Sequence, residues 1–509
     1  MKKYEHELWD NLPFEGFDRD LLEIKKKDWY EYADKLLEKI RYKNVALVAE
    51  TSAGKTIITI LAILAGNFRC LFLAPTRYLC EQHQKLLLEI TGNHSTSKVI
   101  TGLSPKKERF WNYPYIKITF STPHMTLEEF KRGKIDLDKF DLIVIDEFHK
   151  ASGDYPYTKI IKEAKGRTNI LGLSASPGDN RTKIEQVERI CNIQDWVVAE
   201  INTPAKLKDL VIAEPDRVIK TISYRFEALL KKTLKEIDEL MPELEIDPEK
   251  RYLFGFKETD NWKCNADNLK NENQRKAAHF LIAKYIKLYH CYSVSIKESY
   301  ATLLGYTEKL RRQDSKSAQS ILKERYFRDI ISVVKDNFND HPKTVMLEKV
   351  LGKWADLKKN AIVFVNQRDT GEYLKQFLNL YYIRAENIFG GGDKKNLKKQ
   401  DEALSRIAKR DLDVLISTSV IEEGVSVPEV DMIVHYSRPL TGVGYKQRNG
   451  RTARLTKGNI ISLVIDHPLD ILDHKISQAK AGQGERSLKK HVKKREQVQL
   501  TLFSDKEDQ

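Results

Sequence analysis

The chain has 509 residues, of which 41 % are hydrophobic and 31 % are charged, a balance typical of a soluble protein with three or four domains. It contains no run of 18 apolar residues and no apolar signal-peptide core at its start, and its five cysteines are scattered. We therefore expect no membrane contact and a cytoplasmic, nucleoid-associated location. Lys and Arg total 87 against 73 Asp and Glu, and this net charge of +14 suits a polyanionic partner such as nucleic acid, although many basic proteins bind none.

Short apolar runs alternate with helix-like segments in two parts of the chain. The first set is VALVA (45–49), CLFLA (70–74), IKITF (116–120), LIVID (142–146) and ILGLS (170–174). The second set is AIVFV (361–365), DVLIST (413–418), MIVHY (432–436) and IISLVI (460–465). Since strands alternating with helices are typical of parallel sheets covered by helices on both faces, the sequence predicts two α/β lobes, over residues 1–205 and 346–480.

The segment between the lobes, residues 206–345, has helical spacing and few strand signals, which predicts a helical insert. Within it, Tyr285, Tyr289 and Tyr292 share one helix face. We interpret that face as buried, in preference to a platform for stacked bases. The last segment, residues 481–509, is polar and basic, which favours a flexible tail.

The first apolar run leads directly into Thr51-Ser52-Ala53-Gly54-Lys55-Thr56 and then into a helical pattern. A Gly-Lys-Thr loop between strand and helix is typical of a phosphate-binding loop, because its backbone N–H groups and the helix N-terminus favour anions. Lys55 would reach the β- and γ-phosphates, and the Thr56 hydroxyl would hold Mg²⁺. The usual first glycine of such loops is absent, since Glu50 or Ala49 stands at its place.

Two further clusters complete a candidate nucleotide site. Asp146 and Glu147 follow the strand LIVID, where Asp146 would bind Mg²⁺ and Glu147 would polarise the attacking water. The second lobe has no Gly-Lys-Thr loop but carries Gln447-Arg448-Asn449-Gly450-Arg451-Thr452-Ala453-Arg454. Arginines that reach a γ-phosphate from a second domain act as arginine fingers, so ATP would hold the lobes together until it is hydrolysed.

The ordered set of motifs resembles that of superfamily 2 helicases. It comprises AETSAGKT, APTRYL, TGLSPKKER, STPH, DEFH, SAS, IVFVNQRDT, STSVIEEGVSVPEVD and QRNGRTAR. Within that superfamily the chain most resembles the archaeal Hef helicases and their eukaryotic relatives of the FANCM type, over roughly residues 40–480. The resemblance implies two RecA-like lobes and a thumb-like insert that grips branched DNA. The XPF-type nuclease domain of many Hef proteins has no counterpart before Gln509, so we expect none in this chain.

The resemblance also implies roles for individual residues. The ATP and Mg²⁺ site would comprise Ser52, Ala53, Gly54, Lys55, Thr56, Asp146 and Glu147, with Gln447, Arg451 and Arg454 facing the γ-phosphate. Coupling of hydrolysis to strand movement would involve His149, Ser174, Ser176 and Gly424. The nucleic-acid backbone would contact Thr76, Arg77, Thr101, Gly102, Thr122, Asn366 and Thr418, through groups that position a phosphate chain without reading its sequence.

Two positions depart from the family pattern. The glutamine that reads adenine in many relatives has no clear match near Tyr30-Glu31, and the Asp that usually follows Gly-Val in the fifth motif is Ser426. These changes concern the base and ribose contacts and leave the phosphate chemistry intact.

The resulting hypothesis is an ATP-dependent DNA helicase or translocase that remodels branched DNA such as stalled forks, moving 3′ to 5′ by analogy with the family. One alternative is an RNA helicase or a double-stranded RNA-dependent ATPase of the RIG-I type. Another is a non-catalytic scaffold that binds nucleic acid. Near the end, Gln497, Leu500 and Phe503 have the spacing of the motif that binds the sliding clamp PCNA, with Ser504 where a second aromatic usually stands.

Overall fold

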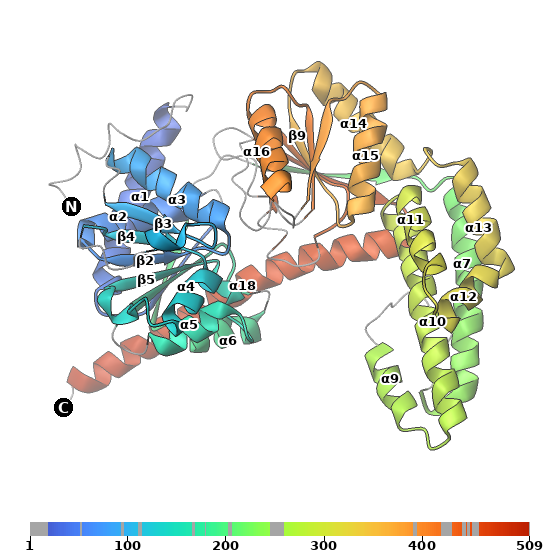
Figure 1. Cartoon of the computed structure of the whole chain (residues 1–509), viewed down its shortest axis with the longest axis horizontal. Helices are drawn as coiled ribbons and strands as arrows, with labels where there is room; N and C mark the ends of the chain where they lie inside the picture. The colour runs from blue at the N-terminus through green and yellow to red at the C-terminus, as the bar shows by residue number, and fades with distance from the viewer. Residues whose placement is uncertain are drawn as a thin grey trace.

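The computed structural model describes residues 19–50, 53–92, 96–109, 115–164, 168–178, 180–201, 206–244, 259–389, 394–418, 430–439, 444, 448–449 and 458–507. Two parallel β-sheets, each covered by helices, form two lobes, and a helical insert lies beside the second lobe (Figure 1). The predicted α/β class with two lobes and a helical insert is therefore confirmed.

The first lobe is built on a seven-stranded sheet with the order β3-β4-β2-β5-β6-β1-β7. Its strands are β1 (Val45–Ala49), β2 (Cys70–Leu73), β3 (Ser97–Ile100), β4 (Ile118–Ser121), β5 (Leu142–Asp146), β6 (Asn169–Ser174) and β7 (Asp195–Ala199). Its helices are α1 (Arg19–Ile40), α2 (Lys55–Gly66), α3 (Arg77–Thr91), α4 (Pro123–Lys131), α5 (Pro156–Glu163) and α6 (Arg181–Cys191). Helices α1 to α3 pack against one face and α4 to α6 against the other, which explains why the central strands are apolar throughout.

The second lobe is built on a six-stranded sheet with the order β10-β11-β9-β12-β13-β8. Its strands are β8 (Lys206–Ala213), β9 (Ala361–Phe364), β10 (Ala385–Ile388), β11 (Val414–Ser417), β12 (Met432–His435) and β13 (Gly458–Ile465). Its helices are α14 (Pro342–Asp356), α15 (Arg368–Leu380) and α16 (Lys394–Ala408). We had expected residues 206–213 in the insert, but they pair with β13 along its whole length as an edge strand.

The insert is an all-helical body with its own core. It contains α7 (Arg217–Leu240), α9 (Thr259–Asp267), α10 (Glu272–Lys297), α11 (Tyr300–Arg311), α12 (Lys316–Lys323) and α13 (Arg325–Asp336). The long helices α7 and α10 pack along each other (Figure 1). Tyr285, Tyr289 and Tyr292 all lie in this core, so the interpretation of their face as buried is confirmed.

Helix α18 (Pro468–Glu507) replaces the flexible tail that we had expected from residue 481. It begins beside β13 and α10 and runs back to the first lobe (Figure 1, red). There Leu488 joins the core under α5 and α6, buried His491 pairs with Glu188, and Lys489 lies 3.2 Å from Glu200. A sequence rich in charge thus forms a helix because one face of it is buried on another part of the chain.

Candidate functional site

The polar motifs of the first lobe gather at one edge of its sheet. The strand order places β5, β6 and β1 side by side, and all three are parallel, so their carboxyl ends meet at the same edge. The Gly-Lys-Thr loop follows β1, the Ser174-Ala175-Ser176 segment closes β6, and Asp146 ends β5. The fold therefore brings together the two motifs of the first lobe that were assigned to nucleotide chemistry and the Ser174-Ala175-Ser176 segment that was assigned to coupling.

Trp29 of α1 packs against the Gly-Lys-Thr loop and is hydrogen-bonded to it. Its indole N–H donates a 2.8 Å hydrogen bond to the carbonyl oxygen of Ala53. Gly54 has a left-handed backbone (φ +85°), and a Cβ atom there would lie 2.4 Å from Nε1 of Trp29. The Lys55 ammonium donates to the carbonyl of Ala49 at 3.2 Å, across the loop. Of the other two predicted residues, Thr56 is the second residue of α2, and Ser52 lies outside the described residues.

Asp146 is nearly buried and its carboxylate has two partners. One oxygen accepts a 3.1 Å hydrogen bond from the backbone N–H of Glu147. The other lies 3.1 Å from Nε2 of His83, and the backbone carbonyl accepts a 2.8 Å bond from the Tyr157 hydroxyl. The carboxylate is thus fixed in orientation at the end of β5, as a metal-binding group requires.

Glu147 occupies an unusual backbone conformation, with a left-handed φ of 52°. This conformation costs a residue with a side chain about 1–2 kcal/mol and is uncommon outside turns and functional sites. Burial alone would raise the pKa of the Glu147 carboxyl, but His149, with further help from Lys55 and Lys150, lowers it to about 2. The carboxylate is therefore held ionised, next to the Lys55 charge, as a group that orients water must be.

His149 links the Glu147 segment to β6. Its Nδ1 atom lies 3.2 Å from the Glu147 carboxylate and 3.1 Å from the hydroxyl oxygen of Ser174. That hydroxyl oxygen also accepts a 3.1 Å hydrogen bond from the backbone N–H of Ser176. The three residues predicted to couple hydrolysis to movement are therefore in direct contact, while Gly424 lies outside the described residues.

The predicted nucleic-acid contacts of the first lobe follow β2, β3 and β4, at the same sheet edge. Thr76 is exposed and caps α3, accepting from the N–H of Leu79, and the Thr122 hydroxyl makes no capping bond at the start of α4. Gly102 is exposed, but Thr101 is only 4 % exposed. Three of these four residues are therefore accessible to a strand, while the Thr101 side chain is buried.

Arg77, the fifth candidate in this lobe, is half-buried and lies 2.9 Å from Glu81 one turn along α3. The two side chains of this pair are 41 % and 47 % exposed, and a pair so open to solvent contributes little to stability, so a phosphate can compete for the guanidinium.

In the second lobe, the amide of Asn366 is already used inside the protein. Its N–H₂ group donates to the carbonyl of Arg438 at 2.9 Å, and its oxygen accepts from Arg448 at 3.1 Å. Arg448 is 2 % exposed and also donates to the carbonyl of Ser437 at 2.9 Å. Asn366 therefore holds a buried arginine, and its contact with nucleic acid stays a prediction.

Thr418 is half-buried at the end of β11. The predicted fingers Gln447, Arg451 and Arg454 lie outside the described residues. Arg448 and Asn449 of the same motif are both buried, and Asn449 accepts a 2.7 Å bond from His435. Arg448 and Asn449 therefore hold this motif within the second lobe, whereas Gln447, Arg451 and Arg454 remain the candidate finger residues. The spacing of the motif alone does not reveal this distinction.

Sequence reasoning also missed Trp29 and His83. The position of Trp29, directly before the region searched for the adenine-reading glutamine, was a signal that could have drawn attention to it. No local pattern around His83 indicates that it reaches Asp146, which is 63 residues away in the sequence.

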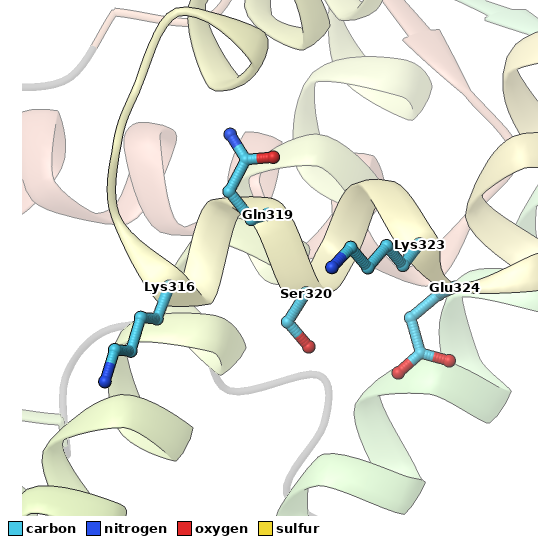
Figure 2. Close-up of a pocket in the computed structure, with 5 residues that line it drawn as sticks. All are labelled: Lys316, Gln319, Ser320, Lys323 and Glu324. Atoms are coloured by element: carbon cyan, nitrogen blue, oxygen red, sulfur yellow. The ribbon is translucent and has the colours of Figure 1, made fainter.

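A cavity of about 540 Å³ lies in the insert, away from both sheet edges. It is lined by Lys316, Gln319, Ser320, Lys323 and Glu324, and Figure 2 shows Lys316, Ser320 and Glu324 extending to one side of α12. Glu324 also accepts a 2.8 Å hydrogen bond from Lys284 of α10. This cavity belongs to the insert and takes no part in the nucleotide site.

Among the described residues, no helix combines the length and apolar character needed to cross a membrane.

Comparison with known proteins identifies both lobes. The DEAD/DEAH box helicase family matches residues 30–184, and the helicase conserved C-terminal domain matches residues 342–456. The crystal structure of the Pyrococcus furiosus Hef helicase domain superposes with a TM-score of 0.62 at 25 % identity, covering 91 % of this chain and 99 % of that one.

Relatives of similar sequence include three proteins from archaea and fungi. MJ1505 of Methanocaldococcus jannaschii, provisionally described as an ATP-dependent RNA helicase, is 30 % identical over 88 % of this chain and 59 % of its own length. The ATP-dependent DNA helicase MPH1 of Pyricularia oryzae is 26 % identical over 86 % of this chain and 43 % of its own. The ATP-dependent DNA helicase fml1 of Schizosaccharomyces pombe is 25 % identical over 85 % of this chain and 56 % of its own length. The chain thus spans about half the length of these relatives.

The chain carries two helicase domains in the expected order. Its fold is shared with a helicase crystal structure over nine-tenths of the chain. The protein therefore belongs to the superfamily 2 helicases. Within that superfamily it is similar to the Hef helicase and to the Mph1 and Fml1 DNA helicases, as the motifs had indicated.

Proposed function

We propose that this protein is an ATP-dependent helicase or translocase that remodels branched DNA, such as stalled forks, and moves 3′ to 5′. The observation that carries the proposal is the meeting of Lys55, Glu147 and Ser174 at adjoining strand ends. An ionised carboxylate beside a phosphate-loop lysine, connected through His149 to the next strand, has the parts needed for hydrolysis and for its transmission.

In this proposal each residue acts on a different part of the nucleotide. The N–H groups at the start of α2 and the Lys55 ammonium bind the phosphates. The oxygen donors Thr56 and Asp146 are of the type Mg²⁺ prefers. Thr56, near the start of α2 after β1, and Asp146, at the end of β5, lie on the same sheet edge, which fits that ion, and Mg²⁺ when bound would neutralise phosphate charge. Glu147 orients the attacking water. Gln447, Arg451 and Arg454 approach from the second lobe, whose motif is anchored by buried Arg448.

Movement would follow from alternating affinity of the lobes for each other. Triphosphate between the phosphate loop and the arginine fingers closes the lobes, and loss of the γ-phosphate releases them. Thr76, Arg77, Gly102 and Thr122 would hold one backbone segment, and Thr418 the next. Asn366 would act by fixing Arg448. The insert, with its rigid pair of long helices, would grip the branch.

The alternative substrate is RNA, which the description of MJ1505 favours, whereas Mph1 and Fml1 are DNA helicases. ATPase activity should be measured with forked DNA, linear duplex DNA and duplex RNA in parallel. We expect the greatest stimulation by forked DNA. Stimulation by duplex RNA alone would establish the RNA alternative, and binding to forked DNA without any hydrolysis would establish the scaffold alternative.

We also propose a contact with a sliding clamp of the PCNA type through Gln497, Leu500 and Phe503. The support is their spacing and their place in the last turns of α18, far from the helix start. A peptide of residues 490–509 and its Leu500→Ala/Phe503→Ala form should be titrated into the host's clamp. We expect micromolar binding by the first and none by the second; equal behaviour of the two would overturn the proposal.

A further inference from the structure

His83 is a buried histidine that the nucleotide chemistry described above does not use. It lies on α3, is 4 % exposed, and its ring contacts that of Phe72 on β2 with 4.9 Å between the centroids. Its Nε2 atom is 3.1 Å from an Asp146 carboxylate oxygen. Because a carboxylate can only accept, the imidazole N–H is the donor of this bond.

The same helix begins at the predicted nucleic-acid contacts. Thr76 caps α3 and Arg77 is its first residue. His83 follows Arg77 after six residues, which is less than two turns, or about 9 Å along the axis. A hydrogen-bonded helix of this length moves as a unit, so displacement of its first turn by a bound strand displaces His83 as well.

At the other end of this connection is the carboxylate assigned to Mg²⁺. The second oxygen of Asp146 is tied to the backbone of Glu147, so the hydrogen bond from His83 is the contact that links the carboxylate to a different element. Partners of this kind set the orientation of a metal-binding carboxylate, and their loss commonly weakens metal affinity by tenfold or more.

We propose that His83 is a positioning residue that couples strand binding at the start of α3 to the orientation of Asp146. The inference rests on the proposed function, since it assumes a nucleic-acid strand at Thr76 and Arg77 and Mg²⁺-nucleotide at Asp146. It differs from the contact of His149 with Ser174, which joins Glu147 to β6, because it lies entirely between α3 and β5.

The direct test is thermodynamic coupling, which does not depend on turnover. The affinity for forked DNA is measured with and without a non-hydrolysable ATP analogue and Mg²⁺, and the ratio gives the coupling factor, typically 5–150-fold in coupled proteins. His83→Leu and His83→Met keep much of the volume and remove the donor. His83→Gln keeps an N–H group near the position of Nε2 and serves as the matched control.

We expect the native protein to show a coupling factor of about fivefold or more. His83→Leu and His83→Met should reduce it to about twofold or less, while the affinity for DNA without nucleotide changes little, and His83→Gln should restore it. The Mg²⁺ concentration needed for half-maximal binding of a fluorescent nucleotide should rise about tenfold in the same two variants, but not in His83→Gln.

Full coupling in His83→Leu or His83→Met, or a His83→Gln variant as uncoupled as those two, would overturn the inference, because the first result makes the bond unnecessary and the second assigns the effect to ring packing. Failure of the proposed function is distinct: the native protein itself would then bind no forked DNA or hydrolyse no ATP.

Discussion

The Trp29 ring fills the space that a side chain at Gly54 would occupy, and its N–H holds the carbonyl of the preceding Ala53 at 2.8 Å. The loop is therefore shaped by a helix that precedes the strand, and the glycine is required for two separate reasons. One is its left-handed backbone, and the other is the indole behind it.

The two reasons can be separated by their effects on nucleotide affinity. Gly54→Ala should abolish measurable nucleotide binding, because it combines a strain of about 1–2 kcal/mol with a 2.4 Å clash. Adding Trp29→Ala should remove the clash and restore part of the affinity, while Trp29→Phe alone should weaken binding several-fold through loss of one hydrogen bond of about 1 kcal/mol. Fluorescent nucleotide titration of the four proteins measures this. Identical affinities of Gly54→Ala and the double variant would show that the contact is irrelevant.

Removal of the proposed catalytic groups should separate hydrolysis from strand binding. Lys55→Ala and Glu147→Gln should each reduce DNA-stimulated turnover by at least a hundredfold, because in the proposed function Lys55 binds phosphate and Glu147 orients water. The affinity for forked DNA should change little, since the residues proposed to bind the DNA backbone lie elsewhere. Steady-state ATPase and DNA-binding assays on the same preparations decide this. Near-normal turnover of Lys55→Ala would show that the site is assigned wrongly.

Selectivity for the base should be weak. The adenine-reading glutamine has no clear match and Ser426 replaces an aspartate, so phosphates would supply most of the binding free energy. GTP, CTP and UTP should therefore compete with ATP at similar concentrations. A preference for ATP of about a thousandfold, roughly 4 kcal/mol, would reveal base contacts that neither the sequence nor the described residues indicate.

Two buried histidines should make the protein sensitive to acid: His341, which contacts α10 of the insert, and His435, at the end of β12 in the second lobe. Burial, together with the nearby Lys343, lowers the pKa of His341 to about 3, and burial with the nearby Arg448 lowers that of His435 to about 3. The unfolded chain takes up these protons near pH 6.5, so stability should fall as the pH drops from about 6.5 towards 3.

The expected slope is about 1.4 kcal/mol per pH unit for each histidine. Denaturant unfolding of the native protein and His341→Gln at pH 7, 6 and 5 measures it. The variant should be less stable at pH 7 but should show a shallower pH dependence. An unchanged slope in His341→Gln would mean that this histidine does not titrate on unfolding.

The sequence predicted the strands that end in the site, because buried parallel strands are apolar runs and their polar ends are conspicuous. It placed β8 in the wrong body, because the first half of this edge strand is charged and the strand that it pairs with, β13, lies far away in the sequence. It also missed α18 as a packed helix, because only a few side chains such as Leu488 are buried against a distant partner. Trp29 and His83 escaped for a related reason: each acts through one contact with a residue far away in the sequence.

Helix α18 connects the second lobe to the first lobe a second time. The chain passes from the first lobe to the second after residue 201, and it returns through a helix about 60 Å long whose His491 pairs with Glu188. The two lobes are therefore joined at two points. They can still rotate about the line through these two connections, while twisting and wide separation of the lobes are resisted. A chain shortened before Leu488 would keep both lobes intact but would leave them connected by one joint, free to swivel about it.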